Sequence, residues 1–466
     1  MKKNLLAFAS AVSCLAVLGA LYINTLFPGP GGRINFGDST KWQLLWWVDG
    51  TPHPTGYPLF LGLTHLFGSQ LNFLPATTRI TLISTSCALL ALAALFALLY
   101  KLCGRIGWAL FGTLVFGTAR SFWSQATEPE VYTLNAFWVA IVALFAVDFA
   151  QTRRPRSLFI CILLFGLSLS HHVTMVWLAP AIFYLIIKID PTQFKQPKLY
   201  LISVLALLAG VLPYYYIYYL SHHAGVLESY NFADTQKNEW LAQGGHLEFI
   251  GKDVSWERFF AYVSGGNFKG ATFSQWPDEG IANLLQNLVA NDVGPVFFLA
   301  AMLIAGRQLL YPAKKDTTQI FLICILLIQA LFAVTYRIDD ILPYYIPITL
   351  CFIVLGIYLF SQRAQPRLLT ALLVLFLLTN GIKNYRWLKE EVNLKDLETR
   401  ETLAPLNETD PVYFERTDFF NYHGFELLNL YRFCQACEFK RFAIADFSRI
   451  DLQQPFFALN PSTEFI

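Results

Sequence analysis

Long apolar runs separated by short polar segments dominate this chain. About eleven such runs recur, and their length and hydropathy predict helices in a bilayer. They lie near residues 5–27, 80–100, 107–124, 131–149, 157–170, 173–188, 199–220, 293–311, 318–336, 342–361 and 367–381. The pattern therefore predicts an all-α polytopic membrane protein with about eleven transmembrane helices. At about 23 residues the first run exceeds the apolar region of a signal peptide, so we expect an uncleaved anchor.

Lysine and arginine gather in alternate connections between the runs, which the positive-inside rule places in the cytoplasm together with the N-terminus. These residues are Lys101, Arg105, Arg153, Arg154, Arg156, Lys188, Lys195, Lys198, Arg307, Lys314, Lys315, Arg363 and Arg367. The intervening segments 28–79, 125–130, 221–292 and 337–341 are then extracytoplasmic. We interpret the runs on either side of His171–His172 as two spans, because one helix would bury this polar pair and invert every later loop.

The chain divides by composition into a membrane part, residues 1–381, and a polar tail, residues 382–466. We expect the tail to form a small extracytoplasmic domain, helical at first and then α/β. The first outer loop is assigned to residues 28–79 and a large outer loop to residues 221–292. Within the large loop, the segment Trp256–Tyr262 is typical of an amphipathic helix lying on the membrane surface.

Composition supports the same class of protein. Hydrophobic residues make up 55% of the chain and charged residues only 14%, whereas soluble domains carry about 25% charged residues. Lysine plus arginine total 34 against 32 acids, so no basic field favours nucleic acid as a partner, and membrane lipids are expected instead. Cys434 and Cys437 are compatible with a disulfide, half a zinc site or no role. An extracytoplasmic location favours the disulfide.

Acids and aromatic residues mark the first two outer loops. Asp38 precedes a short aromatic helix that it could cap, and a turn containing His53 and Tyr57 follows. The second outer loop carries Glu128 and Glu130. Acids favour a helix N-terminus, which accounts for some of this pattern. Ionisable residues at a membrane edge are nevertheless functional candidates, and Tyr132 and Asn135 follow the second pair of acids directly.

Two further groups lie at the same predicted face. His171 and His172 form a pair at a helix junction, where packing is commoner than metal binding and no third ligand has diagnostic spacing. Arg337 lies at the membrane edge, where it could bind a lipid phosphate or extend to the headgroups. No P-loop, GxSxG, HExxH or GxGxxG motif supports nucleotide-driven transport or the common soluble hydrolase mechanisms.

Several motifs together resemble a known family. They are Gly37-Asp38-Ser39, His53-Pro-Thr-Gly-Tyr-Pro-Leu59, Phe122-Trp-Ser-Gln-Ala126, Glu130-Val-Tyr-Thr-Leu-Asn135 and Gly166-Leu-Ser-Leu-Ser-His-His172. Later segments, Trp256-Glu-Arg-Phe259, Val263-Ser-Gly-Gly-Asn-Phe268 and Arg337-Ile-Asp-Asp340, look similar as well. The chain thus resembles a family of multi-spanning GT-C glycosyltransferases that includes the transmembrane protein O-mannosyltransferase of animals.

This resemblance implies a GT-C-like bundle that transfers a sugar from a polyprenyl-phosphate carrier to an extracytoplasmic acceptor. It implies that Asp38 is the general base and that Glu130 is a second-loop site residue. Relatives commonly carry Gly-Asp-Ser-Gly-Glu, whereas this chain has Thr40 and Lys41 after the serine. One first-loop carboxylate is therefore missing, which would alter the choice of donor or acceptor, or the activity itself.

The residues fit that chemistry on independent grounds. Sugar transfer from a lipid phosphate needs a base for the acceptor proton and a cation or donors for the departing phosphate. Asp38 suits the first role. Arg337 ranks first for the second, with His171 and His172 after it. A direct displacement would invert the configuration of the anomeric carbon. A divalent cation, Mg or Mn, is a possible cofactor.

Three alternatives remain open from the sequence. The acceptor could be a Ser or Thr hydroxyl of an exported protein, a glycolipid or a surface polysaccharide. A flippase of lipid-linked glycans would share the aromatic outer loops, but the spans contain few ionisable groups for a conduit. A non-enzymatic assembly factor is disfavoured by the outer-loop acids.

Overall fold

The structure is a computed structural model of the 466-residue chain. It describes residues 2–27, 32–33, 36–46, 51–52, 54–71, 73–223, 256–266, 270–273, 277–310, 316–338, 340–362, 371–372, 374–390, 411–414, 443–446 and 457–459. Cys434, Cys437 and His53 lie outside these residues.

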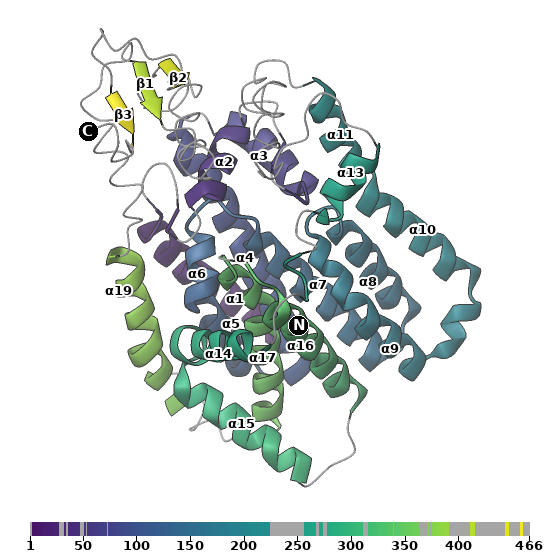
Figure 1. Ribbon diagram of the computed structural model, residues 1–466. Helices are drawn as coiled ribbons and strands as arrows, with labels where there is room; N and C mark the ends of the chain where they lie inside the picture. The colour runs from purple at the N-terminus through teal and green to yellow at the C-terminus, as the bar shows by residue number, and fades with distance from the viewer. Residues whose placement is uncertain are drawn as a thin grey trace.

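Apolar helices form the body of the molecule (Figure 1). Within the described residues, six helical segments are long and apolar enough to cross a membrane. They comprise α1 (Lys2–Asn24), α4 (Ala76–Cys103), α7 (Tyr132–Thr152), α10 (Pro197–Val211) continued by α11 (Tyr214–His223), α16 (Thr317–Thr335), and η5 (Leu342–Tyr345) continued by α17 (Ile346–Ser361). A seventh span is possible if Asp278–Asp292 and Gly294–Gly306, bent by 116°, form one broken span. The prediction of an all-α polytopic membrane protein is confirmed.

The number of full-length spans is smaller than the eleven predicted runs, because several runs form shorter helices. The run near 107–124 is divided between α5 (Ile106–Gly117) and α6 (Arg120–Ala126). The runs around the histidine pair form α8 (Pro155–Ser168), and then η1 (Val173–Leu178) with α9 (Ala179–Ile189). The predicted break at the pair is confirmed: the His172 side chain accepts the Thr174 N–H at the start of η1.

The other elements surround this bundle. They are α2 (Phe36–Leu45), α3 (Pro58–Gln70), η2 (Pro191–Lys195), α13 (Trp256–Val263), α14 (Pro277–Gln286), η4 (Asn287–Asp292), α15 (Gly294–Leu310), η6 (Leu377–Gly381) and α19 (Ile382–Glu390). Three short strands, β1 (Pro411–Phe414), β2 (Ala443–Asp446) and β3 (Phe457–Leu459), form a parallel sheet in the order β2-β1-β3. Figure 1 places α2, α3, α11 and α13 at one end of the bundle, where the outer loops were expected to meet.

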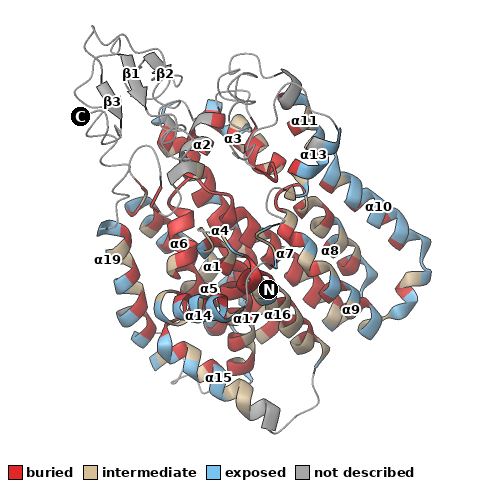
Figure 2. Ribbon diagram, viewed as in Figure 1, coloured by how far each residue is buried: buried red, intermediate tan, exposed pale blue. Residues whose placement is uncertain are grey.

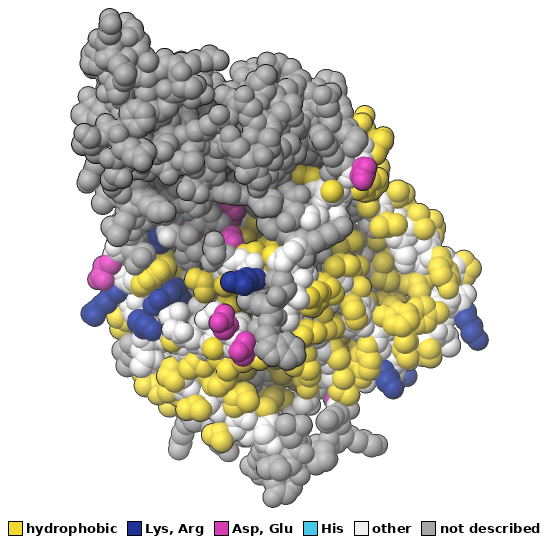
Figure 3. Space-filling model, in the orientation of Figure 1, with side chains coloured by type: hydrophobic (Ala, Val, Ile, Leu, Met, Phe, Trp, Pro, Cys, Tyr) yellow, Lys and Arg dark blue, Asp and Glu magenta, His cyan; other side chains and the backbone are white. Residues whose placement is uncertain are grey.

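Helices α4 and α7 lie at the centre of the bundle, and α10 lies at its edge. About two thirds of the residues in the most apolar stretches of α4 and α7 are buried inside the protein, against 17% in the segment Pro197–Leu220. Figure 2 shows this contrast as a red centre beside a largely pale-blue α10. In Figure 3 the same edge is a broad hydrophobic surface. Exposed apolar residues on a membrane helix face lipid, so α10 belongs to the lipid boundary.

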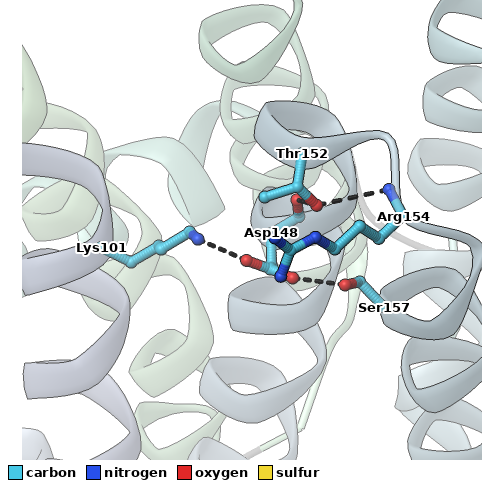
Figure 4. A network of polar contacts seen from close by, with 5 residues as sticks. All are labelled: Lys101, Asp148, Thr152, Arg154 and Ser157. Atoms are coloured by element: carbon cyan, nitrogen blue, oxygen red, sulfur yellow. Dashed lines mark hydrogen bonds and ion pairs between the residues drawn. The ribbon is translucent and has the colours of Figure 1, made fainter.

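A polar network joins three helices near the C-terminal ends of α4 and α7 (Figure 4). Lys101 of α4 forms an ion pair with Asp148 of α7. The hydroxyl of Ser157 in α8 donates to the other oxygen of Asp148, and Thr152 Oγ1 donates to the Asp148 carbonyl at 2.7 Å. Side-chain hydrogen bonds of this kind help to hold apolar helices in one register.

Candidate active site

Asp38 lies in the first turn of α2, and its side chain is half-buried. The expectation that Asp38 caps this helix is corrected, because α2 begins two residues earlier, at Phe36. A carboxylate in the first turn still benefits from the exposed N–H groups of the helix. The negative charge of Asp38 acts on two buried neighbours, Glu130 and Tyr57, and raises the pKa of each. The first outer loop and the second outer loop therefore meet at Asp38.

The second outer loop carries two fully buried acids, Glu128 and Glu130. Glu130 accepts hydrogen bonds from the Ser39 hydroxyl at 3.4 Å and from the Val131 N–H at 3.3 Å. Its backbone is held by Ser84 of α4, whose hydroxyl bonds both the Glu130 N–H and the Glu130 carbonyl at 2.9 Å. Helix α4 thus fixes the position of Glu130, while Ser39 brings the first loop to its carboxyl group.

Glu128 connects the two loops a second time. Its carboxylate accepts a hydrogen bond from Gln125 Nε2 at 2.6 Å and another from the backbone N–H of Arg33. The buried guanidinium of Arg33 donates to the carbonyls of Thr25 at 2.6 Å and Leu388 at 3.1 Å. Arg33 therefore ties the first loop to the second loop, to the end of α1 and to α19.

Burial makes the Glu130 carboxyl group a weaker acid than an exposed glutamate. Desolvation is the main reason that the pKa of Glu130 lies well above its ordinary value, and the charges of Asp38, Glu128 and Asp340 raise this pKa further. The Val131 N–H opposes them. Glu130 consequently remains a neutral acid over a wider pH range than an exposed glutamate, and it can donate a hydrogen bond as well as accept one.

Aromatic rings from four elements surround the acids. Tyr57 follows Gly56 at a turn where both residues have positive φ, 96° and 41°, and this turn directs the chain into α3. The Tyr57 ring lies 5.3 Å from the His172 ring and 6.0 Å from the Trp42 ring. Tyr132 lies 6.0 Å from the His172 ring, at the start of α7. The first turn, the second loop and the histidine pair thus lie close together.

Tyr344 of η5 adds a ring that the sequence reasoning missed. Its centroid lies 5.5 Å from that of Tyr132, 5.9 Å from that of His172 and 5.2 Å from that of Tyr336. Together, Trp42, Tyr57, Tyr132, His172 and Tyr344 form what we call the aromatic group. The signal available in the sequence was the tyrosine pair Tyr344-Tyr345, four positions after Asp340.

Asp340 is the fourth acid of the site and was not among the expected site residues. It is half-buried, and its charge raises the pKa of Tyr57 as well as that of Glu130. Arg337 lies three positions earlier, and its side chain is exposed. The Arg337 N–H donates to the Ala271 carbonyl at 3.0 Å, which joins this segment to residues 270–273.

His171 is buried and neutral. Burial lowers the pKa of His171 to about 3, against the opposing effect of its hydrogen bond to the Val131 carbonyl. Because that carbonyl can only accept, His171 Nε2 carries the proton of the 2.9 Å contact. His171 Nδ1 has no hydrogen-bond partner among the described residues. His172 differs, since its Nδ1 lies 2.8 Å from Thr174 Oγ1.

Three further expectations concern Asn135, Lys41 and metal binding. Asn135 is buried in the first turn of α7, and its Oδ1 has no hydrogen-bond partner within the described part of the chain. Lys41 lies in α2, and its side chain is outside the described set. No group of three His, Cys, Asp or Glu residues that could hold a metal ion occurs among the residues the structure describes.

Comparison with known proteins matches the segment that carries most of this site. Residues 43–194 match the family model described as the N-terminal domain of protein O-mannosyl-transferase TMEM260. The mouse protein O-mannosyl-transferase TMEM260 is 28% identical over 219 residues, or 45% of this chain and 30% of its own length. The Dictyostelium discoideum protein of the same name is 23% identical over 150 residues, or 31% of this chain and 18% of its own length.

The matched segment includes Tyr57, both second-loop acids and the histidine pair, whereas Asp38 lies just before it and Arg337 far beyond it. The alignments span less than a third of the length of each relative. The resemblance drawn from the motifs is nevertheless confirmed: through residues 43–194, this chain is similar to the N-terminal domain of the TMEM260 protein O-mannosyl-transferase family.

Proposed function

We propose that this chain is a membrane glycosyltransferase of GT-C type. It transfers a sugar, with mannose as the first choice, from a polyprenyl-phosphate carrier to a hydroxyl of Ser or Thr in an exported protein. The observation that carries this proposal is the meeting of Asp38, Glu130 and Asp340 beside the aromatic group. The names of the curated relatives support the choice of sugar and of a protein acceptor.

Asp38 is the general base in this proposal. The acceptor oxygen attacks the anomeric carbon, the bond from that carbon to the carrier phosphate breaks, and Asp38 takes the acceptor proton. A single displacement inverts the anomeric carbon. Asp38 is better suited than Glu130 to accept the proton, because Asp38 is only half-buried whereas Glu130 is buried among three other acids. Glu130 instead offers a hydrogen bond to a substrate hydroxyl.

Two acids in contrasting environments commonly divide catalytic roles in this way. The aromatic group supplies a surface on which the substrate can bind. Tyrosine rings pack against the apolar C–H faces of a sugar and keep a polar edge for hydrogen bonds. Tyr344 is the ring of this kind that remains partly exposed.

Arg337 is assigned to the departing carrier phosphate. A guanidinium binds phosphate oxygens in pairs, and the Arg337 side chain is exposed beside the buried Tyr336. His171 is less suited to this role, because it is neutral and its Nε2 proton is already donated to Val131. No step of the proposal passes through a metal ion.

The test is transfer of radiolabel from a panel of polyprenyl-phosphate sugars to endogenous acceptors in membranes. Asp38→Asn should lower transfer by about 100-fold or more, since a positioned base contributes about 10² to 10⁴. Asp148→Asn is the matched control: it neutralises an aspartate that pairs with Lys101 away from the site, so transfer per folded molecule should be unchanged.

The position of the label identifies the acceptor class. Label that runs with protein supports the proposed acceptor, while label that runs with lipid or polysaccharide assigns the alternative acceptors. Normal transfer by Asp38→Asn would overturn the assignment of the base. Absence of label from every donor with the native chain would overturn the enzyme proposal and favour a flippase.

A further inference from the structure

Asp292 is a fully buried carboxylate outside the group of acids described above. It ends η4, at the 116° bend before α15. Its Oδ1 accepts the backbone N–H of Ser121 at 2.9 Å. Its Oδ2 accepts the Ser121 hydroxyl at 2.8 Å, the Thr349 hydroxyl at 2.8 Å and Asn287 Nδ2 at 3.1 Å. Four donors from α6, α17 and η4 thus converge on one side chain.

Burying a charged group in a helix bundle costs free energy unless hydrogen bonds or an ion pair compensate it. A buried carboxylate is therefore expected to have a structural or functional role. Part of this role lies at the start of α6. The residue before this helix, Ala119, has no side chain that can cap it. The Ser121 N–H is one of the donors that a helix leaves unpaired at its N-terminus, and Asp292 accepts it from another element. Asp292 therefore fixes where α6 begins.

The two helices that Asp292 joins both lead into the candidate site. Helix α6 ends at Ala126, directly before the loop with Glu128 and Glu130. Helix α17 is preceded by η5 and Asp340, so Thr349 lies little more than one turn after Tyr344. The position of Asp292 between Ser121 and Thr349 consequently sets the distance between the second-loop acids and the Asp340–Tyr344 segment.

A second set of contacts involves η6 and α19, which are consecutive in the chain. Asn380 Nδ2 donates to the Asp292 carbonyl at 3.1 Å. Asn384 Nδ2 donates to the carbonyls of Thr118 and Asn291 at 2.9 and 2.7 Å. At the other end of α19, the Leu388 carbonyl accepts a hydrogen bond from Arg33 Nε. The backbone N–H of Arg33 in turn donates to the Glu128 carboxylate. Polar contacts thus connect Asp292 to Glu128 by two routes, one through α6 and one through α19.

We propose that Asp292 is a positioning residue for sugar transfer, which holds α6 against α17 so that the second-loop segment ending in Tyr132 stays beside Tyr344. This proposal rests on the proposed function. Substrate contact is not required of Asp292, because it acts through the two helices that carry the site residues.

The experiment compares Asp292→Asn with the milder Thr349→Val, which removes one donor to Asp292 and leaves the carboxylate in place. The matched control is Asp148→Asn, which alters the other polar network between helices. For each purified full-length variant we would measure kcat and KM for the polyprenyl-phosphate sugar, normalised to folded protein. Hydrogen exchange of residues 120–131 and 340–349 supplies a readout that does not depend on activity.

Asp292→Asn should lower kcat by about 10- to 100-fold with little change in KM, because small misplacements of reacting groups carry costs of this size. Thr349→Val should lower kcat by a smaller factor. Exchange should rise in both segments for both variants, whereas Asp148→Asn should retain kcat and raise exchange only near its own partners. If Asp292→Asn fails to fold, Thr349→Val decides the question by the same two readouts.

Unchanged kcat per folded molecule together with unchanged exchange in residues 120–131 would overturn the positioning role. An equal loss in the Asp148→Asn control would overturn it as well, because a general effect on folding would then explain the data. Absence of transfer by the native chain would instead overturn the proposed function. The exchange measurement would then still show whether Asp292 orders the two segments.

Discussion

Burial changes the pKa of Glu130, and with it the pH dependence of stability. The folded chain binds the Glu130 proton more tightly than the unfolded chain does, because the folded-state pKa is raised. The contribution of this group to the free energy of unfolding is therefore complete below about pH 4.3, the ordinary glutamate value. This contribution falls as the pH rises from there toward the raised pKa.

A test follows from this sign. Glu130→Gln removes the titrating group, so the unfolding temperature should fall less steeply with rising pH than it does for the native chain. Thermal unfolding in detergent, measured as a series of rising pH values from about pH 4, gives this slope. Glu390→Gln, at an exposed position of α19, is the control and should leave the slope unchanged. Equal slopes for the native chain and Glu130→Gln would contradict the expectation.

At the scale of elements, the close approach of α8 and α10 depends on small residues. A Cβ atom added to Gly166 would lie 2.3 Å from the Ala206 carbonyl oxygen, and one added to Gly210 would lie 2.3 Å from the Gly166 carbonyl oxygen. Ala206 and Gly210 are four positions apart, which places both on one face of α10. Small residues at this spacing let membrane helices pack backbone to backbone.

Gly166→Ala should therefore separate the two helices and destabilise the protein by about 1 to 3 kcal/mol, as overpacking commonly does. The measurement is the midpoint of thermal or denaturant unfolding in detergent. Gly306→Ala on α15 is a matched control in an apolar helix, because its added Cβ would have no neighbour within 4 Å. A Gly166→Ala variant as stable as Gly306→Ala would contradict this role for the α8–α10 contact.

At the scale of the whole molecule, the remaining expectation is orientation in the membrane. The predicted outer loops contribute α2, α3 and α13 to one end of the bundle (Figure 1). The Lys101–Asp148 network lies near the C-terminal ends of α4 and α7 (Figure 4), whereas the N-terminal ends of these helices follow α3 and the second outer loop. Exposed residues at the two ends are Ser69 on α3 and Arg154 beside the network. The positive-inside rule assigns Arg154 to the cytoplasm and Ser69 to the outside.

Single cysteines at these positions test the assignment. In a chain whose eight native cysteines are replaced, Ser69→Cys should react with an impermeant maleimide in intact cells, whereas Arg154→Cys should react only after permeabilisation. Labelling in the reverse order would invert the proposed topology and would place Asp38 on the cytoplasmic side. Labelling of both positions in intact cells would contradict the predicted number of spans between them.

The sequence alone determined the class of the protein and the location of its longest apolar helices, although several of the eleven predicted runs form shorter helices. A bilayer requires about 20 consecutive apolar residues for each span, and this requirement is local, so it can be read from hydropathy. The break at His171–His172 and the helix around Trp256 were predictable for the same reason. Asp38, Glu128 and Glu130 were identified as candidates because acids at a membrane edge are unusual in so apolar a chain.

Only the tertiary structure decided which of these residues meet. Asp340 and Tyr344 lie more than two hundred positions beyond Glu130, and Asp292 had no motif to mark it. Their roles depend on how α6, α17 and α19 pack, which is set by side-chain contacts between distant segments and not by local pattern. The raised pKa of Glu130 also belongs to this level, because burial and three neighbouring charges arise only when the loops assemble.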